Sequence, residues 1–399
     1  MLIDWIIIII YLIVVLFIGA NAAKKVSSTS DYFISDRKFG KGMMMLFTFG
    51  TGTNTDQAVT VASKTYTSGA SGIWYQWLWL FATPFYWLLA PLFRRMRAVT
   101  TADYLHKRYG QSVAVLFAIV GIAQLSVNIG VVLKATSAMI HPVSGGSISP
   151  EFAIIAMTIL FVSYGVLGGL NAAIVTDALQ GVLTVFLSFL ILPFALNAVG
   201  GLDGLRSVID DPSVFKVVAP GEITTLYVIV IAINGLIGWV TSPYSMAMCG
   251  AGKTEHESRI GLVGGMLMKR ICTIAWVLTG LCAIGLYADN TIDVDHVYGL
   301  MAHDLLPTIA PGLIGLFIAS MLAAVMSSCD ALMVSASALF TENVYKTLIQ
   351  PGRDEKHYIF VGRLTSIFIV LFGIIIAFKL SSVVGGLEMF WKVQAMMGV

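Results

Sequence analysis

The stretch Phe47–Ser68, FTFGTGTNTDQAVTVASKTYTS, interrupts a hydrophobic segment that otherwise has the character of a membrane-spanning helix. Its centre, Gly50–Gln57, contains no large apolar side chain. Lipid offers a backbone no hydrogen-bond partners, so irregular chain at membrane depth is tolerated only where it lines a cavity or packs within protein. The stretch therefore favours a broken helix that builds an ion and solute site. The alternative is one long helix whose polar face packs on neighbouring helices.

The composition places this stretch in a polytopic helical membrane protein. Of the 399 residues, 57% are hydrophobic and 12% are charged, whereas soluble domains carry about 25% charged residues. Apolar runs of roughly 20 residues recur along the whole chain. The net charge of +2 gives no indication of a nucleic-acid partner, and the four cysteines match no zinc or disulfide spacing. We expect the lipid bilayer and a small solute as partners, and no obligate protein partner.

Ten apolar segments and the start of an eleventh are predicted to form transmembrane helices. They lie at about 2–22, 43–67, 72–93, 112–140, 150–168, 172–199, 223–250, 261–287, 311–345 and 358–380, with the eleventh from about 383. The last one stops at Val399, short of the roughly 20 residues that a span needs, so we expect the natural C-terminus to lie further on. Met1 to Ala23 has Asp4 in place of a basic leader, which indicates a retained anchor helix.

The distribution of Lys and Arg predicts the orientation. Basic residues follow the first, third, seventh and ninth segments, whereas the loops at 68–72, 141–149, 200–222 and 288–310 are poor in them. Cytoplasmic loops carry the excess of Lys and Arg. We therefore expect a multi-pass plasma-membrane protein with its N-terminus outside.

A second interruption lies in the seventh segment, INGLIGWVTSPYS, where Pro243 removes a helix hydrogen bond and clashes with the preceding turn. Secondary transporters often consist of two inverted repeats, each with a discontinuous helix. We predict one transmembrane domain with an accessory helix at 1–25, a first repeat at 40–199 and a second at 223–399. The alternative is that Pro and Gly are ordinary residues of membrane helices.

Several polar residues in the apolar segments are candidates for the site. Ser327 and Ser328 are adjacent hydroxyls, and with carbonyls of an unwound helix they could supply about five hard oxygen donors, which suit sodium. The other small residues of that segment are explained by close helix packing. Asp177 either caps its helix or belongs to an ion pathway near Ser327 and Asp330.

The remaining candidates point to a solute cavity. Asp56 is a carboxylate at membrane depth, which marks a functional site by default. Of Lys269 and Arg270, one is expected to extend towards the cytoplasm and the other to reach the cavity. Gln57 and Gln76 need partners, which could be each other, the backbone or a polar solute.

Four motifs, in order along the chain, resemble those of the sodium:solute symporter family, which includes bacterial sodium/proline, sodium/galactose and sodium/sialic acid symporters. They are Asp31–Phe33 (DYF), Thr101–Tyr109 (TADYLHKRY), Tyr164–Gly181 (YGVLGG…TDALQG), and Met326–Ser328 with Thr341–Lys346 (TENVYK). The resemblance covers the whole chain. It implies an all-α LeuT-type fold with inverted five-helix repeats and an extra N-terminal helix. It also implies sodium-coupled uptake across the bacterial inner membrane and no enzymatic activity.

The resemblance also implies particular ligands. The family's main sodium site falls on Gly50, Thr53, Ala324, Ser327 and Ser328. Some relatives hold a second sodium near the residue that matches Asp177, but Asp330 and Ala331 stand where those relatives have two serines. Asp330 could compensate for them or pair with a basic group.

Substrate contacts of relatives fall on Asn54, Gln57, Gln76, Ser242 and roughly Lys269. The aspartate that some relatives use in the first broken helix is Gly52 here, so Asp56 remains a candidate on its burial alone.

The solute class stays open at this point. Glutamines and aromatics suit a sugar or polyol, Asp56 with Lys269 suits a zwitterion, and Lys269 or Arg270 alone suits a carboxylate. The rival function is a membrane sensor of the same fold with a C-terminal signalling domain. A membrane enzyme is less favoured because no nucleophile–base pair or metal set accompanies the acids.

Overall fold

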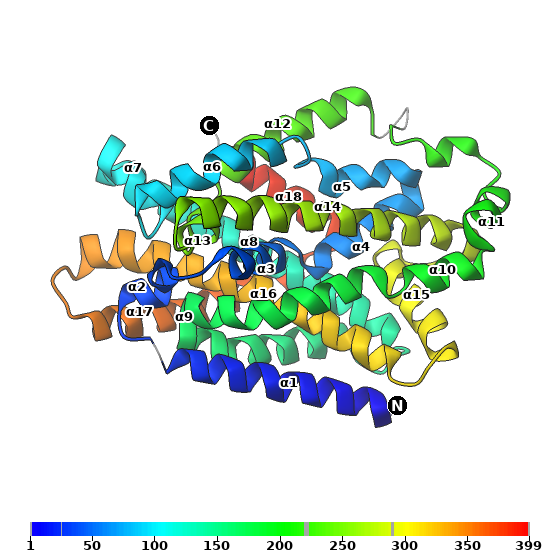
Figure 1. Cartoon of the computed structure of the whole chain (residues 1–399), viewed down its shortest axis with the longest axis horizontal. Coiled ribbons are helices and arrows are strands. Elements are labelled where there is room, and N and C mark those ends of the chain that lie inside the picture. Colours follow the sequence, from blue (N-terminus) through cyan, green and yellow to red (C-terminus); the bar gives the residue numbers. More distant parts are fainter. Residues whose placement is uncertain (1, 25, 219–222, 289–290, 398–399) are drawn as a thin grey trace.

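The computed structural model describes residues 2–24, 26–218, 223–288 and 291–397, and these residues are nearly all helical. Lys25 in the basic loop after the first segment, Asp289 in the loop at 288–310 and Val399 lie outside the described residues. Six long helices run along the long axis of the molecule (Figure 1). They are α1 (Leu2–Ala23), α8 (Gln111–Val143), α9 (Pro150–Phe189), α14 (Glu255–Leu286), α16 (Leu313–Phe340) and α17 (Glu355–Lys379).

Both predicted helix breaks are present. The second apolar segment forms α3 (Lys41–Gly52) and α4 (Thr55–Ser68), and the two residues between them have extended backbones. The seventh segment forms α12 (Thr225–Thr241) and α13 (Ser245–Gly250), with the break around Pro243. Each break therefore lies where the sequence lacks large apolar residues or carries a proline.

The helix α9 folds back on itself at Gly169, where φ is 55°. Gln180 Nε2 donates to Tyr164 Oη over 3.3 Å, although 16 residues of straight helix would separate the two by about 24 Å. A Cβ at Gly169 would also lie 2.4 Å from the Tyr32 carbonyl oxygen, so both the left-handed backbone and the close approach require glycine. The predicted fifth and sixth segments are thus two antiparallel halves.

The third segment differs from the expectation of one helix over 72–93. It consists of α5 (Trp74–Trp77), a turn at 78–82 and α6 (Thr83–Met96). Hydrogen bonds in the turn connect residues three apart, from Leu80 N to Trp77 O at 2.8 Å and from Thr83 N to Leu80 O at 3.2 Å. Pro84 opens α6 and has no N–H to continue an α-helix from the preceding turn.

The remaining elements connect or extend these helices. A π-helix, η6 (Thr341–Ile349), continues α16, and α18 (Val383–Met396) follows α17. The connecting helices are α2 (Thr29–Ile34), η1 (Ser35–Arg37), η2 (Gly69–Ile73), α7 (Thr101–Tyr109), α10 (Leu192–Ala198), α11 (Gly201–Val208), η3 (Pro212–Phe215), η4 (Val294–His296), α15 (Val297–Leu305) and η5 (Leu306–Thr308).

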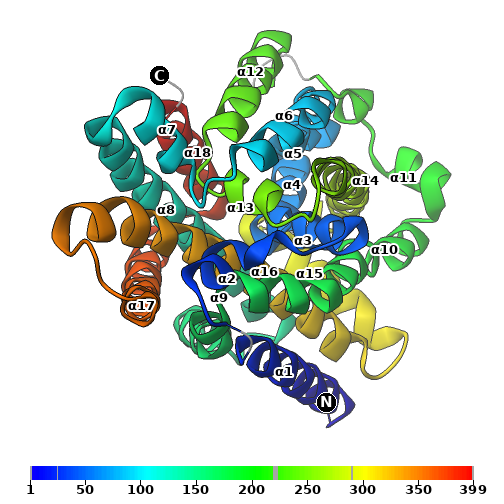
Figure 2. The same ribbon diagram turned by 60° about the vertical axis from the view of Figure 1, so that its left-hand side comes forward.

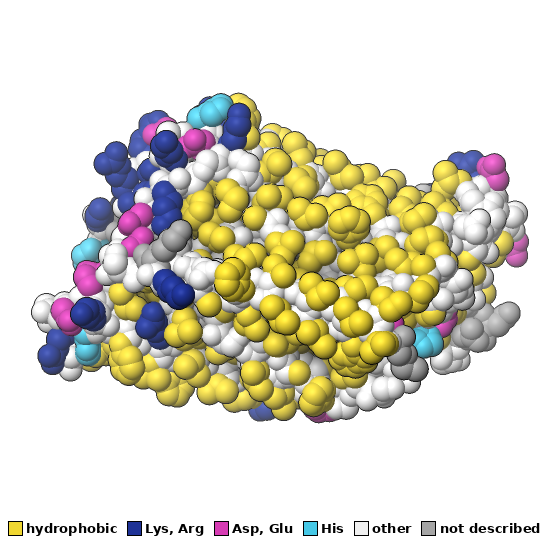
Figure 3. Space-filling model, turned by 60° about the horizontal axis from the view of Figure 1, so that its bottom comes forward, with side chains coloured by type: hydrophobic (Ala, Val, Ile, Leu, Met, Phe, Trp, Pro, Cys, Tyr) yellow, Lys and Arg dark blue, Asp and Glu magenta, His cyan; other side chains and the backbone are white. Residues whose placement is uncertain are grey.

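The surface has the apolar character of a membrane protein. Six helices in the described part of the chain are long and apolar enough to cross a membrane. The sequence predicts ten complete spans. The count from the structure is lower because each half of a broken helix is too short by itself, and because α9 and α10 together count as one span. Figure 3 shows apolar side chains over the middle of one face, with Lys and Arg gathered at the end where α7 lies in Figure 1.

The interior is built around α16, whose residues 319–339 are all buried. It packs against α8, α9 and α3, while α3 packs closely against α14. Figure 2 shows α3, α13, α14 and α16 near the middle, with α1, α12 and α17 at the periphery. The breaks in α3–α4 and α12–α13 therefore lie inside the bundle, where polar backbone can find partners.

Candidate functional site

The break between α3 and α4 brings unpaired backbone to the centre of the molecule. Thr53 (φ −135°, ψ 105°) and Asn54 (φ −128°, ψ 174°) have extended backbones. The Thr53 N–H donates to the Gly50 carbonyl over 3.3 Å. The last carbonyls of a helix have no partner within the helix, so the end of α3 presents oxygens to its neighbours.

The helix α16 faces these carbonyls with two hydroxyls. Ser328 Oγ donates to the carbonyls of Gly50 and Thr51, each over 3.3 Å. Ser327 Oγ is fully buried and has no hydrogen-bond partner within the described residues. A Cβ built on Gly50 would lie only 2.7 Å from Ser327 Oγ. The close approach of α3 to α16 therefore depends on glycine at position 50.

The residues that the family resemblance assigns to sodium lie at the end of α3 and on α16. Gly50, Ser327 and Ser328 are brought together, Thr53 caps the end of α3, and Ala324 lies one turn before the serines on α16 and is fully buried. Carbonyls and hydroxyls are hard, uncharged donors that suit a small hard cation. The unpaired Ser327 hydroxyl fits such an ion because a buried polar atom otherwise costs free energy.

Asp177 lies beside this oxygen set. It is fully buried within α9, two turns beyond Gly169, and its Oδ2 accepts from Thr51 Oγ1 over 3.3 Å. Its Oδ1 has no hydrogen-bond partner in the described part of the chain. Asp177 thus faces α3 from the middle of its helix, so of the two alternatives the capping one is wrong.

Asp330 is a second buried acid, on α16. Neither of its carboxylate oxygens has a hydrogen-bond partner among residues 2–24, 26–218, 223–288 and 291–397. A Cβ at Gly165 would lie 2.3 Å from Asp330 Oδ1, and the Tyr164 phenol is a close neighbour. Asp177 is an electrostatic neighbour of Asp330. Asp330 forms no ion pair with any described basic group. Of the two roles considered for Asp330, the structure therefore does not show pairing with a basic group.

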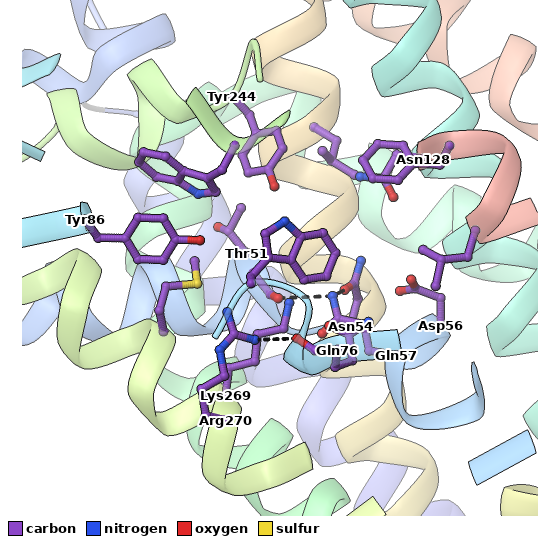
Figure 4. A pocket seen from close by; sticks show the side chains of 17 residues that line it. Thr51, Asn54, Asp56, Gln57, Gln76, Tyr86, Asn128, Tyr244, Lys269 and Arg270 are labelled. Carbon is purple, nitrogen blue, oxygen red and sulfur yellow. Dashed lines mark hydrogen bonds between the residues drawn. The ribbon is translucent and has the colours of Figure 1, made fainter. Parts of the chain in front are cut away.

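A small pocket with a cavity volume of about 40 Å³ lies on the other side of the broken helix. Figure 4 shows its polar and aromatic lining. It is lined by Thr51, Gly52, Asn54, Asp56, Gln57, Gln76, Trp79, Tyr86, Asn128, Trp239, Tyr244, Met266, Lys269, Arg270, Leu332, Leu387 and Phe390. Aromatic walls with a few polar groups are typical of sites for small organic molecules.

Five of the six proposed substrate residues line this pocket. They are Asn54, Asp56, Gln57, Gln76 and Lys269. Ser242 is buried in the break between α12 and α13 and does not line the pocket, whereas Tyr244, two residues later, does.

The two glutamines do not bond each other. Gln57 Nε2 donates to Asn54 Oδ1 and, over 3.1 Å, to the Gly52 carbonyl. Both atoms of the Gln76 amide lack hydrogen-bond partners in the described structure, as does Gln57 Oε1. Three amide atoms at this pocket are therefore available to a polar molecule.

Lys269 and Arg270 both line the pocket and are 6% and 5% exposed. The expectation that one of them extends to the cytoplasm is therefore wrong. Lys269 Nζ lies 5.0 Å from the Trp79 ring centre, and Arg270 Nη1 donates to the Gln76 carbonyl over 2.9 Å. That carbonyl is free because Leu80 N bonds to Trp77 O at the end of α5.

The sequence interpretation missed several lining residues. Tyr86, Trp239, Tyr244 and Phe390 carry no signal that separates a pocket wall from ordinary aromatic packing. Asn128 is different, because an amide within the apolar segment at 112–140 is the same signal that singled out Gln57.

A model of the sodium:solute symporter family matches residues 32–399. The chain is 27% identical to the uncharacterized symporter YidK of Escherichia coli (strain K12) over 154 residues, which cover 39% of this chain and 26% of that protein. It is 24% identical to the sodium/proline symporter of the same organism over 158 residues, covering 37% and 31%. It is also 24% identical to a sodium/glucose cotransporter of Vibrio parahaemolyticus over 184 residues, covering 42% and 32%. The matched stretches span only 26% to 32% of these relatives' own length.

Two solved structures share the fold. The chain is similar to the substrate-bound, outward-open state of a Na⁺-coupled sialic acid symporter, with a TM-score of 0.83 and 20% identity over 99% of this chain and 84% of that one. It is also similar to MhsT in complex with L-phenylalanine, with a TM-score of 0.61 and 14% identity over 90% and 88% of the two chains. The LeuT-type fold expected from the sequence is confirmed.

Proposed function

Because this chain belongs to the sodium:solute symporter family, we propose that it imports a small polar organic solute together with sodium by alternating access. The observation that carries this proposal is the oxygen set between the end of α3 and α16, which lies next to a polar, aromatic pocket. The relatives named for proline and glucose, and the sialic acid symporter structure, support coupling to sodium but differ in their solutes.

Sodium binds in this proposal to the carbonyls of Gly50, Thr53 and Ala324 and to the hydroxyls of Ser327 and Ser328. The ion holds the broken helix against α16 and so favours the conformation that binds solute. A ligand shifts a conformational equilibrium only by its differential affinity for the two states. Release of sodium to the cytoplasm removes these contacts and allows the solute to leave.

The solute occupies the pocket beside the same break. Asn54, Asp56, Gln57, Gln76 and Lys269 contact it. Ser242 acts from the break of α12 through its neighbour Tyr244, whose phenol it adjoins. One broken helix thus serves both ligands, which links sodium binding to solute binding without a long path between the sites.

Asp177 and Asp330 hold a second coupling cation. Three of their four carboxylate oxygens have no hydrogen-bond partner within the described chain, and a cation between them would offset the cost of burying two acids. Asp330 supplies here the oxygens that two serines supply in some relatives. The second cation is either sodium or a proton.

The chain is a multi-pass membrane protein. We place it in the bacterial inner membrane with the Lys- and Arg-rich end in the cytoplasm and the N-terminus outside. The residues at 40–199 and 223–399 form the two inverted repeats, since each begins with a broken helix, and α1 is accessory. The family and the fold are those of transporters, which also speaks against the sensor alternative.

The experiment that tests this function is a thermal unfolding series of the purified chain in lipid nanodiscs. Sodium chloride should raise the midpoint above that in potassium chloride at equal ionic strength, because a ligand of the folded state stabilises it by about 2.7 kcal/mol at a hundred times its Kd. A panel of sugars, amino acids and carboxylates is then screened in both salts. Equal midpoints in the two salts across the whole panel would contradict sodium coupling.

A further inference from the structure

Arg270 carries a buried charge that no acid of the described structure compensates. The residue is 5% exposed, and the Gln76 carbonyl to which its guanidinium donates is neutral. The phenol of Tyr86 is its other polar neighbour. Ionisable residues at membrane depth normally pair with one another or with a ligand, so the lack of an acid beside Arg270 is unusual.

Asp56 does not fill this role. It lies across the pocket from Arg270 (Figure 4), and its charge acts on Lys269 rather than on Arg270. By formal charge, Lys269 and Arg270 contribute two positive charges and Asp56 one negative charge. The charged side chains that line the pocket therefore leave one excess positive charge on the side of Arg270.

The pocket lining carries both unpaired donors and unpaired acceptors. Arg270 Nε, Gln76 Nε2 and Trp239 Nε1 have no hydrogen-bond partner in the part of the chain that the structure describes. The same holds for the acceptors Gln76 Oε1, Asp56 Oδ1 and Gln57 Oε1. Donors of this kind bind a carboxylate, and the planar guanidinium can hold it through two parallel hydrogen bonds.

We propose that the solute is a monocarboxylate anion whose carboxylate binds Arg270, with its hydroxyl or amide donors directed to Asp56 and Gln57. The inference rests on the proposed function, since it names the solute class of that same pocket. Binding of one negative charge neutralises the excess positive charge of the lining. Arg270 is then a specificity-determining residue, and the proposal selects the carboxylate from the solute classes that the sequence left open.

The test compares probes that differ in charge but share a carbon skeleton. The pairs are glucuronate with glucose, and gluconate with sorbitol. Lactate is compared with both 1,2-propanediol and the zwitterion alanine. The thermal midpoint of the full chain in nanodiscs is measured for each probe in sodium chloride and in potassium chloride. At least one carboxylate should raise the midpoint in sodium while its neutral or zwitterionic partner does not.

Arg270→Gln should weaken the binding of that carboxylate at least about tenfold, because an uncompensated anion then replaces a charge pair. Arg259→Gln is the matched control. Arg259 lies on the same helix but stacks on Trp87, 5.1 Å from the ring centre, and is not in the pocket lining. Arg259→Gln should leave the apparent affinity for the carboxylate probe unchanged.

The ligand-free protein gives a second measurement that needs no known solute. Arg270→Gln removes a buried charge without an acidic partner, so its midpoint should equal or exceed that of the wild type. A midpoint of ligand-free Arg270→Gln several degrees below that of the wild type would overturn the proposal. A neutral or zwitterionic probe that binds the wild type at least as well as the matching carboxylate would also overturn it. Sodium-dependent binding of neutral probes would leave the symporter function standing, whereas an absence of any sodium effect would contradict the function itself.

Discussion

The Ser328 hydroxyl donates to the Gly50 carbonyl oxygen over 3.3 Å and so joins α16 to the last turn of α3. Ser327, its neighbour, lies where a Cβ at position 50 would project. This contact connects the broken helix that lines the solute pocket to the most deeply buried helix of the bundle. A cation that binds here would act on both elements at once.

Gly50→Ala should abolish sodium-dependent stabilisation. The added Cβ would lie 2.7 Å from Ser327 Oγ and 3.6 Å from Asp177 Cγ, so α3 and α16 must separate and the oxygen set is disturbed. Gly42→Ala on the same helix is the control, since its Cβ meets no atom within 4 Å, and it should stabilise the protein by up to about 1 kcal/mol. Retention of the full sodium response by Gly50→Ala would show that the ion binds elsewhere.

Asp330→Asn should reduce the number of coupling cations. The amide keeps the size of the side chain but removes the carboxylate that would bind the second cation. If the two acids hold a second sodium, the Hill coefficient for sodium-driven uptake should fall from about 2 to about 1. If the second cation is a proton, the coefficient stays the same and the coupling of uptake to the pH gradient is lost. If the variant keeps both the wild-type Hill coefficient and the wild-type coupling to the pH gradient, Asp330 is not part of the coupling site.

Asn343→Ala should destabilise the end of the molecule that is rich in Lys and Arg. Asn343 lies in the π-helix that continues α16, donates to Asp103 Oδ1 over 2.6 Å and accepts from Thr100 Oγ1 over 2.7 Å. Loss of the amide leaves these partners without their bonds, which costs about 1–3 kcal/mol. Thermal unfolding should show a lower midpoint than for Ser207→Ala, an exposed control whose hydroxyl bonds only within its own turn. Equal midpoints would mean that water replaces the lost bonds.

Asp295→Asn should change how stability depends on pH. Burial raises the pKa of Asp295, with a further contribution from Asp293, despite the 2.7 Å hydrogen bond that its Oδ2 accepts from Val383 N. The folded state thus holds the proton more tightly than the unfolded state, so the free energy of unfolding falls as pH rises above the ordinary Asp pKa of about 3.9. In the asparagine variant, position 295 does not titrate, so it causes no such fall in the free energy of unfolding. Its advantage in thermal midpoint over the wild type should grow from acid to neutral pH, and parallel curves would refute the assignment.

Much of the fold could be predicted because its irregular points have local causes. Gly50–Gln57 lacks large apolar residues, Pro243 cannot donate a hydrogen bond, and Gly169 adopts a positive φ. The break after Trp77 was missed because apolar and aromatic residues continue through it. Its consequence is a free Gln76 carbonyl, and this carbonyl holds Arg270 in the pocket.

The candidate site was predicted less completely because sequence does not give the direction of a side chain. Lys269 and Arg270 are adjacent, and either could extend along the helix to water. Both turn inward because α14 packs between α3 and α6, so the polar groups of the pocket are their nearest partners. The aromatic wall was missed for a similar reason, since Tyr86 and Trp239 look like ordinary packing residues in an apolar segment.

The measurement that tests the central proposal most directly is a sodium titration of the Ser327→Ala, Ser328→Ala double variant in proteoliposomes. Wild-type uptake, with a solute found in the panel screen, should rise with sodium and saturate. The double variant should insert normally and show no sodium-dependent uptake, while the control Ser320→Ala, whose hydroxyl bonds to Leu316 O within the same helix, should behave as the wild type. An unchanged sodium dependence in the double variant would contradict the proposed site.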